Sequence, residues 1–101
     1  MDYNNDNTMK NVMANTITIN VEMWAFDNGS IRDVQIPADT MAEDINSNVF
    51  EFGQNMFQRK NFPSVSVGDV IVHSGYHKVE GVGFKEITEA EMEAYRKEMT
   101  R

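Results

Sequence analysis

Residues 16–37 read TITINVEMWAFDNGSIRDVQIP, two alternating runs separated by a turn sequence. In the first run, from Thr16 to Phe26, every second residue is apolar and β-branched residues are frequent, which is typical of a strand with one buried face. Asn28-Gly29 supplies the positive φ that a tight turn requires. The second run ends at Pro37, which cannot donate to a strand ladder. The stretch therefore predicts an antiparallel β-hairpin.

The next segment carries apolar residues at helical spacing. Steps of four, four, three and four residues separate Met41, Ile45, Val49, Phe52 and Met56. This stripe predicts a helix over 41–58 with one face on the sheet. Thr40-Met41-Ala42-Glu43 has the form of a capping box, in which a hydroxyl and a carboxylate satisfy the first amides of a helix. Gly53 weakens such a helix by up to about 1 kcal/mol unless it permits a close packing contact.

Short β-branched runs separated by glycines fill the C-terminal half. They predict strands at 64–67, 70–72, 76–79 and 82–87, with turns at Gly68-Asp69 and Ser74-Gly75 and a bulge or bend at Gly81 and Gly83. A second capping-box sequence, Thr88 to Glu91, opens a helix that runs to about Met99. We expect one α+β domain over 16–101, with an antiparallel sheet of about four or five strands, one main helix packed on it and a short C-terminal helix.

Composition sets the broad class of protein. The chain has 101 residues, which is enough for one domain, and it has no cysteine, which excludes disulfides and thiolate metal sites. No apolar run approaches the ~20 residues that span a bilayer. Residues 1–15 are polar and rich in Asn, which predicts a disordered leader and does not resemble a signal peptide. We expect a cytoplasmic protein with no membrane partner.

The charge balance is acidic. The formal net charge is -7, whereas binding to a phosphate backbone needs clustered cations. The densest basic pairs, Arg59–Lys60 and Arg96–Lys97, are those expected near helix C-termini. We therefore predict no direct nucleic-acid binding. The acidity favours solubility or a partner protein with a basic surface.

Residues with catalytic potential are few. His73 and His77 are four apart, but Ser74-Gly75 intervenes, so they are expected to flank a turn rather than to hold a metal. Gly81 to Lys85 lacks the third glycine of a dinucleotide fingerprint and the ending of a P-loop. We predict no catalytic residues, no metal and no cofactor, and thus no enzyme. Tyr76 and His77 remain candidates for contacting a small ligand.

Two groups of residues are candidates for contacting a partner. If Trp24 and Phe26 share the face opposite the apolar one, the first strand is apolar on both faces near its end. That arrangement indicates either a strand between two covering elements or an exposed aromatic patch, including a homodimer seam. Three glutamates near the start of the C-terminal helix, Glu89, Glu91 and Glu93, are the candidate acidic contacts.

The region around residues 46–87 resembles a known family. Residues 63–72 read PSVSVGDVIV, and Gly75-Tyr76 and the strand sequence VGFKEI at 82–87 follow. With the helix sequence before it, this region resembles the signature of the YodL-like domains, although Tyr76-His77 stands where that family often has paired tyrosines. The resemblance implies a setting in phages, plasmids and conjugative elements, often beside antirestriction modules. It implies no catalytic residues.

These observations lead to one main hypothesis and two alternatives. The main hypothesis is a phage or mobile-element accessory protein that binds a host or phage protein, such as one in a defence or nucleic-acid-processing complex, and inhibits it. One alternative is a structural or self-assembling phage protein that forms a homo-oligomer through Trp24 and Phe26. The other is a small-ligand-binding domain that uses Tyr76 and His77.

Overall fold

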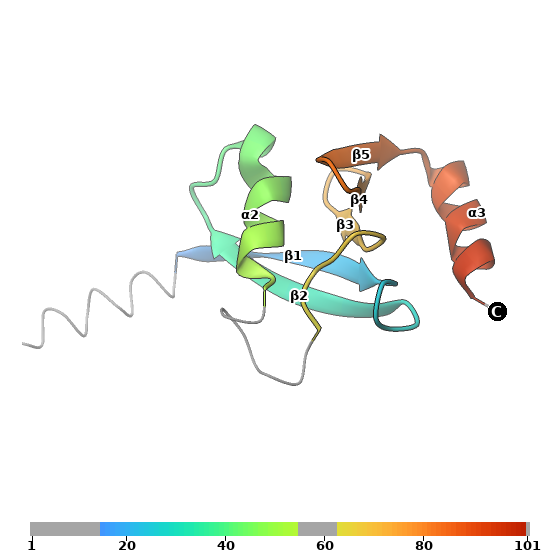
Figure 1. Cartoon of the computed structure of the whole chain (residues 1–101). Helices are drawn as coiled ribbons and strands as arrows, with labels where there is room; N and C mark the ends of the chain where they lie inside the picture. The colour runs from blue at the N-terminus through green and yellow to red at the C-terminus, as the bar shows by residue number, and fades with distance from the viewer. Residues whose placement is uncertain (1–14, 55–62, 101) are drawn as a thin grey trace, which may run out of the picture.

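One antiparallel sheet organises the molecule (Figure 1). The structure, a computed structural model, describes residues 15–54 and 63–100. The strands are β1 (Thr16–Met23), β2 (Ser30–Pro37), β3 (Val70–Val72), β4 (Tyr76–Val79) and β5 (Phe84–Ile87), and the helices are the 3-10 turn η1 (Ala42–Asp44), α2 (Ile45–Phe52) and α3 (Glu89–Met99). The predicted α+β fold is confirmed. All but the last residue of the predicted leader lies outside the described residues.

The strand order β2-β1-β3-β4-β5 places β1 inside the sheet, paired with β2 on one side and with β3 on the other. Since side chains alternate between the faces of a strand, the register assigns each residue to a face. Val21 pairs with Arg32 and Ile71, so these three share one face, while Glu22 pairs with Ile31 and Val70 on the other. The hydrophobic clusters show that each face carries a helix, α2 on the first and α3 on the second.

The larger core lies beneath α2. Its buried members come from the predicted inward face of the hairpin, from α2, from the irregular segment before β3, and from β3 and β4: Ile19, Val21, Met23, Val34, Ile36, Val49, Val65, Ile71 and Val79. Their alternation in β1 and β2 is the pattern on which the hairpin was predicted. The smaller cluster under α3 consists of Trp24, Val70 and Met92, with Tyr76, Ile87 and Tyr95 packed around it.

The main helix is shorter than predicted. The stripe from Met41 was expected to form a helix to Gln58, but η1 and α2 together cover only 42–52, and Met41 is 61% exposed. Residues 55–62, which include Met56 and the Arg59–Lys60 pair, lie outside the described residues. Gly53 follows the helix, and a Cβ there would come within 2.4 Å of a Val65 methyl group. The glycine therefore permits a close packing contact, as the sequence suggested.

Of the two predicted capping boxes, one forms. Thr88 accepts from the Glu91 amide at 3.1 Å, while the Glu91 carboxylate accepts from the Thr88 amide at 2.8 Å. Thr40 does not cap a helix, because its hydroxyl donates to the Pro37 carbonyl at 2.6 Å and accepts from Asn48 at 3.0 Å. The turn that leaves β2 thus occupies the hydroxyl that the capping box needed.

The predicted strand at 64–67 was wrong. This segment is irregular, with Val65 buried in the core and Val67 exposed. Gly68 then adopts a φ of +104°, which turns the chain into β3. The predicted bend at Gly81 and Gly83 is the connection between β4 and β5, where Gly83 has a φ of +78°. No helix in the described ranges 15–54 and 63–100 is long and apolar enough to cross a membrane.

Candidate functional site

An exposed aromatic side chain lies in the connection between β1 and β2. Phe26 is 73% exposed, whereas Trp24, two residues earlier, is only 9% exposed. The sequence predicted that both lie on a strand and share a face, with a tight turn after them. In the structure β1 ends at Met23, and residues 24–29 form a longer loop that closes through the Gly29 amide and the Met23 carbonyl at 2.8 Å. We call residues 24–29 the hairpin loop.

Asp69 explains why β1 ends early. Its side chain is fully buried, and Oδ1 accepts from the amides of Trp24 at 2.7 Å and Ala25 at 2.8 Å. Oδ2 accepts from the Ser66 amide at 2.8 Å. The Ala38 amide donates to the Asn15 carbonyl, so odd-numbered residues of β1 hydrogen-bond to β2 and even-numbered residues hydrogen-bond to β3. The Trp24 amide is thus the next β1 donor on the β3 side, and it binds the Asp69 carboxylate instead of the β3 backbone. The base of the hairpin loop is thereby fixed to the turn before β3.

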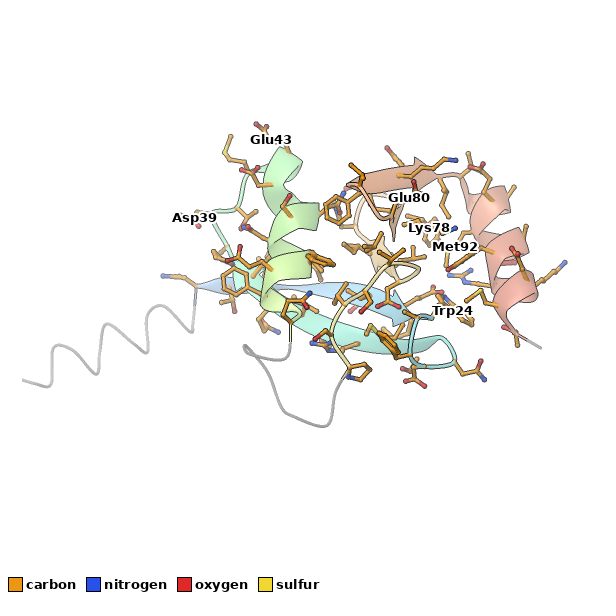
Figure 2. The ribbon with its side chains drawn as sticks, in the orientation of Figure 1. Trp24, Asp39, Glu43, Lys78, Glu80 and Met92 are labelled. Atoms are coloured by element: carbon orange, nitrogen blue, oxygen red, sulfur yellow. The ribbon has the colours of Figure 1, made fainter. Side chains whose placement is uncertain are left out.

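The buried Trp24 ring packs against the hairpin loop. Its ring lies so close to Gly29 that a Cβ on that glycine would come within 2.5 Å of it. The indole also meets Tyr95 of α3 edge to face, with the ring centroids 6.3 Å apart. Figure 2 shows Trp24 and Met92 between the sheet and α3. Trp24 is therefore packed between two elements, and of the predicted aromatic pair only Phe26 is accessible.

The loop itself is tied by Asp27. The Asp27 carboxylate accepts from the Asn28 amide at 2.8 Å and from the Ser30 hydroxyl. The Ser30 hydrogen bond is the main reason that the pKa of Asp27 is lowered, and the Asn28 amide adds to it. Hydrogen bonds at the base and within the loop thus hold the backbone on both sides of Phe26.

A charge network joins β1 to α3. Glu22 is buried and accepts from Trp24 Nε1 at 3.2 Å and from Arg96 Nε at 3.1 Å, and its other oxygen pairs with Arg96 Nη2. Arg96 also contacts Glu93 at 2.9 Å. The hydrogen bond to Glu22 is the main reason that the pKa of Arg96 is raised. The sequence did not predict this pair, because Glu22 lies between Val21 and Met23, at a position where the alternating pattern places a solvent-facing residue.

The three predicted acidic contacts differ in their surroundings. All are exposed, but Glu91 closes the capping box and Glu93 pairs with Arg96. Hydrogen bonds to Thr88 lower the pKa of Glu91. Within the described part of the chain, the Glu89 carboxylate makes no hydrogen bond or ion pair. Glu89 is thus the least constrained of the three carboxylates.

Tyr76 and His77 do not line one site. As neighbours on β4 they point to opposite faces, Tyr76 toward α3, where Arg96 lies 5.5 Å from its ring centroid. His77 stacks on His73 with ring centroids 4.2 Å apart. His73 Nε2 lies 2.7 Å from the Asn46 side-chain oxygen of α2, and His77 Nε2 lies 2.9 Å from the His73 carbonyl. The two histidines flank a turn, as predicted.

A shallow hollow of about 240 Å³ lies between α3 and the β4–β5 hairpin. Lys78 and Lys85, which pair directly across the two strands, line it, together with Tyr95 and three glutamates. Lys78 Nζ lies 4.4 Å from the Tyr95 ring centroid, and Lys85 contributes to the lowered pKa of Glu91. Both lysines therefore interact with residues of α3, Lys78 with the Tyr95 ring and Lys85 with Glu91. In residues 15–54 and 63–100, no three His, Asp or Glu side chains are grouped to hold a metal ion.

Comparisons with protein-family models, with curated proteins and with solved structures give no match. The resemblance to YodL-like domains therefore rests on the quoted residues alone.

Proposed function

We propose that this protein acts by binding another protein, and that Phe26 in the hairpin loop is a central contact. The observation that carries the proposal is a large aromatic side chain, 73% exposed, on a loop whose backbone is fixed at several points. Interfaces draw much of their energy from a few aromatic anchors. An anchor held in place before binding loses little conformational entropy on binding.

The charge of the molecule indicates the kind of partner. The net charge is -7, and Asp27 lies beside Phe26 in the loop. A complementary partner would offer an apolar pocket for Phe26 surrounded by Lys or Arg. Glu89 and Glu93 could add acidic contacts at the edge of such an interface, where they would mainly speed association.

The biological setting comes from the sequence resemblance alone. If the chain shares the setting of YodL-like domains, its partner is a host or phage protein in the bacterial cytoplasm. Inhibition of a defence or nucleic-acid-processing complex is the most specific form of the proposal. A protein that acts in this way needs no cofactor and no catalytic residues.

The test is an affinity pull-down of the tagged protein from a bacterial lysate, read by mass spectrometry, with two matched variants. Phe26→Asp places a charge in the hairpin loop, and Val82→Asp places one at a 96%-exposed apolar residue of the β4–β5 loop. We expect a stoichiometric partner that is retained by the wild-type chain and by Val82→Asp, lost by Phe26→Asp, and weakened by salt.

Two results would contradict the proposal. Retention of the same partner by Phe26→Asp would remove the hairpin loop from the interface. Recovery of the tagged chain alone, with a fixed oligomer in light scattering that Phe26→Asp dissociates, would support the self-assembling alternative instead. Circular dichroism of both variants shows whether each is folded.

A further inference from the structure

The strand that follows the hairpin loop forms an outer edge of the sheet. β2 is eight residues long and is paired only with β1 within the described part of the chain (Figure 1). The Ala38 amide donates to the Asn15 carbonyl at 2.9 Å, which makes these two residues a hydrogen-bonded pair. Since such pairs alternate along an antiparallel ladder, even-numbered residues of β2 bond to β1. Ile31, Asp33 and Gln35 therefore direct their amide and carbonyl groups away from β1.

No hydrogen bond joins these three outward backbone positions to any residue that the structure describes outside β1. Three successive outward residues offer a row of donors and acceptors to another extended chain. Pro37 ends this row, because it has no amide hydrogen. The edge is thus long enough for pairing and has a defined end.

The side chains along this edge are also available. Ile31 is 59% exposed and Asp33 is exposed, while Gln35 hydrogen-bonds to Thr16 and Thr18 of β1. Ile31 and Asp33 are two residues apart, so they lie on the same face of the sheet. The edge begins at Ser30, directly after the hairpin loop. It is therefore continuous in the chain with the proposed Phe26 contact.

The exposed charged side chains that the structure describes on and near the β2 edge are all negative. From Ala25 to Gln54 the only Lys or Arg is Arg32, which is buried and donates to the Pro63 carbonyl at 2.6 Å. The acidic residues of this stretch are all exposed: Asp27, Asp33, Asp39, Glu43, Asp44 and Glu51. Figure 2 shows Asp39 and Glu43 at the end of the molecule away from α3. A second copy of the chain would bring the same acidic surface, whereas a basic segment would complement it.

We propose that a partner protein adds a sixth, antiparallel strand to β2, with Lys or Arg opposite Asp33 and an apolar residue opposite Ile31. In an antiparallel pair the second of these lies two residues after the first, so the segment has the pattern cation, any residue, apolar. This inference rests on the proposed function and names the type of segment that is bound. Main-chain hydrogen bonds would supply affinity, and the two side-chain contacts would supply specificity.

The test uses a displayed library of random linear peptides, selected on the immobilised full-length chain. We expect enrichment of peptides with the predicted spacing. Asp33→Pro removes one outward amide, and Asp33→Lys reverses the charge, so both should weaken binding by about tenfold or more, while Val82→Asp should not. Hydrogen exchange at the amides of Ile31, Asp33 and Gln35 should slow when the peptide binds, which a contact through side chains alone would not cause.

Several outcomes would overturn the inference. One is that no peptide is enriched, and another is that the slowed amides lie on β5 or α3. A third is slow exchange of the three β2 amides in a dimer without peptide, which would assign the edge to a second copy. If Asp33→Pro keeps the partner from the pull-down while Phe26→Asp loses it, strand addition is wrong and the proposed function stands. If neither variant loses the partner, the proposed function fails as well.

Discussion

The backbone amide of Trp24 donates to Asp69 Oδ1 at 2.7 Å, although 45 residues separate the two in the sequence. The same oxygen accepts from Ala25, and the second oxygen accepts from Ser66. One buried carboxylate therefore ends β1, begins the hairpin loop and holds the turn before β3. This arrangement links the proposed contact, Phe26, to the centre of the fold.

We predict that Asp69→Ala destabilises the protein by about 2–4 kcal/mol, because it leaves three buried or partly buried amides without their acceptor. Asp69→Asn should cost less, since one side-chain oxygen remains. Urea denaturation measures both, with the exposed Asp33→Ala as the control. If Asp69→Ala unfolds at the same urea concentration as Asp33→Ala, the carboxylate does not hold the loop as described.

Two of the loop glycines with positive φ, Gly29 and Gly83, allow a matched comparison. Gly29 (φ +85°) lies against the Trp24 ring, while a Cβ on Gly83 (φ +78°) would have no atom of the described residues within 4 Å. Gly83→Ala should cost about 1 kcal/mol from backbone conformation alone. Gly29→Ala adds a clash with the ring and should cost about 1–3 kcal/mol more. Thermal unfolding of the two variants checks this order, and equal losses would mean that Trp24 does not support the loop.

Features that depend on neighbouring residues in the sequence were mostly predicted correctly, whereas features that depend on contacts between distant segments were not. The alternation in β1 and β2 is local, and it predicted the hairpin and its buried face. The α+β class also followed from local patterns, the helical spacing after Thr40 and the short β-branched runs of the C-terminal half. Thr40 and Thr88 begin similar capping-box sequences, yet only Thr88 caps a helix, because Pro37 already binds the Thr40 hydroxyl. The sequence pattern could not distinguish them without the turn geometry.

The candidate site depends more than the hairpin does on contacts between residues far apart in the sequence. Trp24 and Phe26 occupy equivalent positions in the alternating sequence, so the pattern places both on one face. Asp69 binds the Trp24 amide and ends the strand there, and as a result Trp24 is buried while Phe26 lies exposed in the loop. The partner of Glu22 is 74 residues away. No local signal identifies Arg96 as that partner, which is why the charge network was not predicted.

The coupling between Glu22 and Arg96 should be measurable by a double-mutant cycle. Arg96→Met alone leaves a buried carboxylate without its charged partner, whereas Glu22→Gln/Arg96→Met removes both charges. Because Arg96 is partly exposed and Glu22 is buried, we expect a coupling energy of about 1–2 kcal/mol, between the values for surface and buried pairs. Urea denaturation of the four proteins gives this energy, and additive losses would show that the pair contributes nothing beyond its separate side chains.

The stacked histidines predict a pH dependence of stability. Burial is the main reason that the pKa of His73 is lowered, the nearby His77 lowers it further, and Glu86 acts in the opposite direction. Near the ordinary pKa of histidine, about 6.5, the unfolded chain therefore binds more protons at this position than the folded chain. Stability then rises with pH, so it should fall as the pH is lowered from about 7.5 to 5.5, above the range where most carboxylates titrate.

His73→Gln tests this assignment, because it removes the titrating ring while an amide remains beside Asn46, the α2 residue that contacts His73. Urea denaturation of the wild-type chain and of the variant should be measured at several pH values across this interval. We expect the wild-type unfolding free energy to fall toward low pH more steeply than that of His73→Gln. Parallel curves would mean that protonation of His73 does not contribute, and a steeper curve for the variant would reverse the sign derived from its lowered pKa.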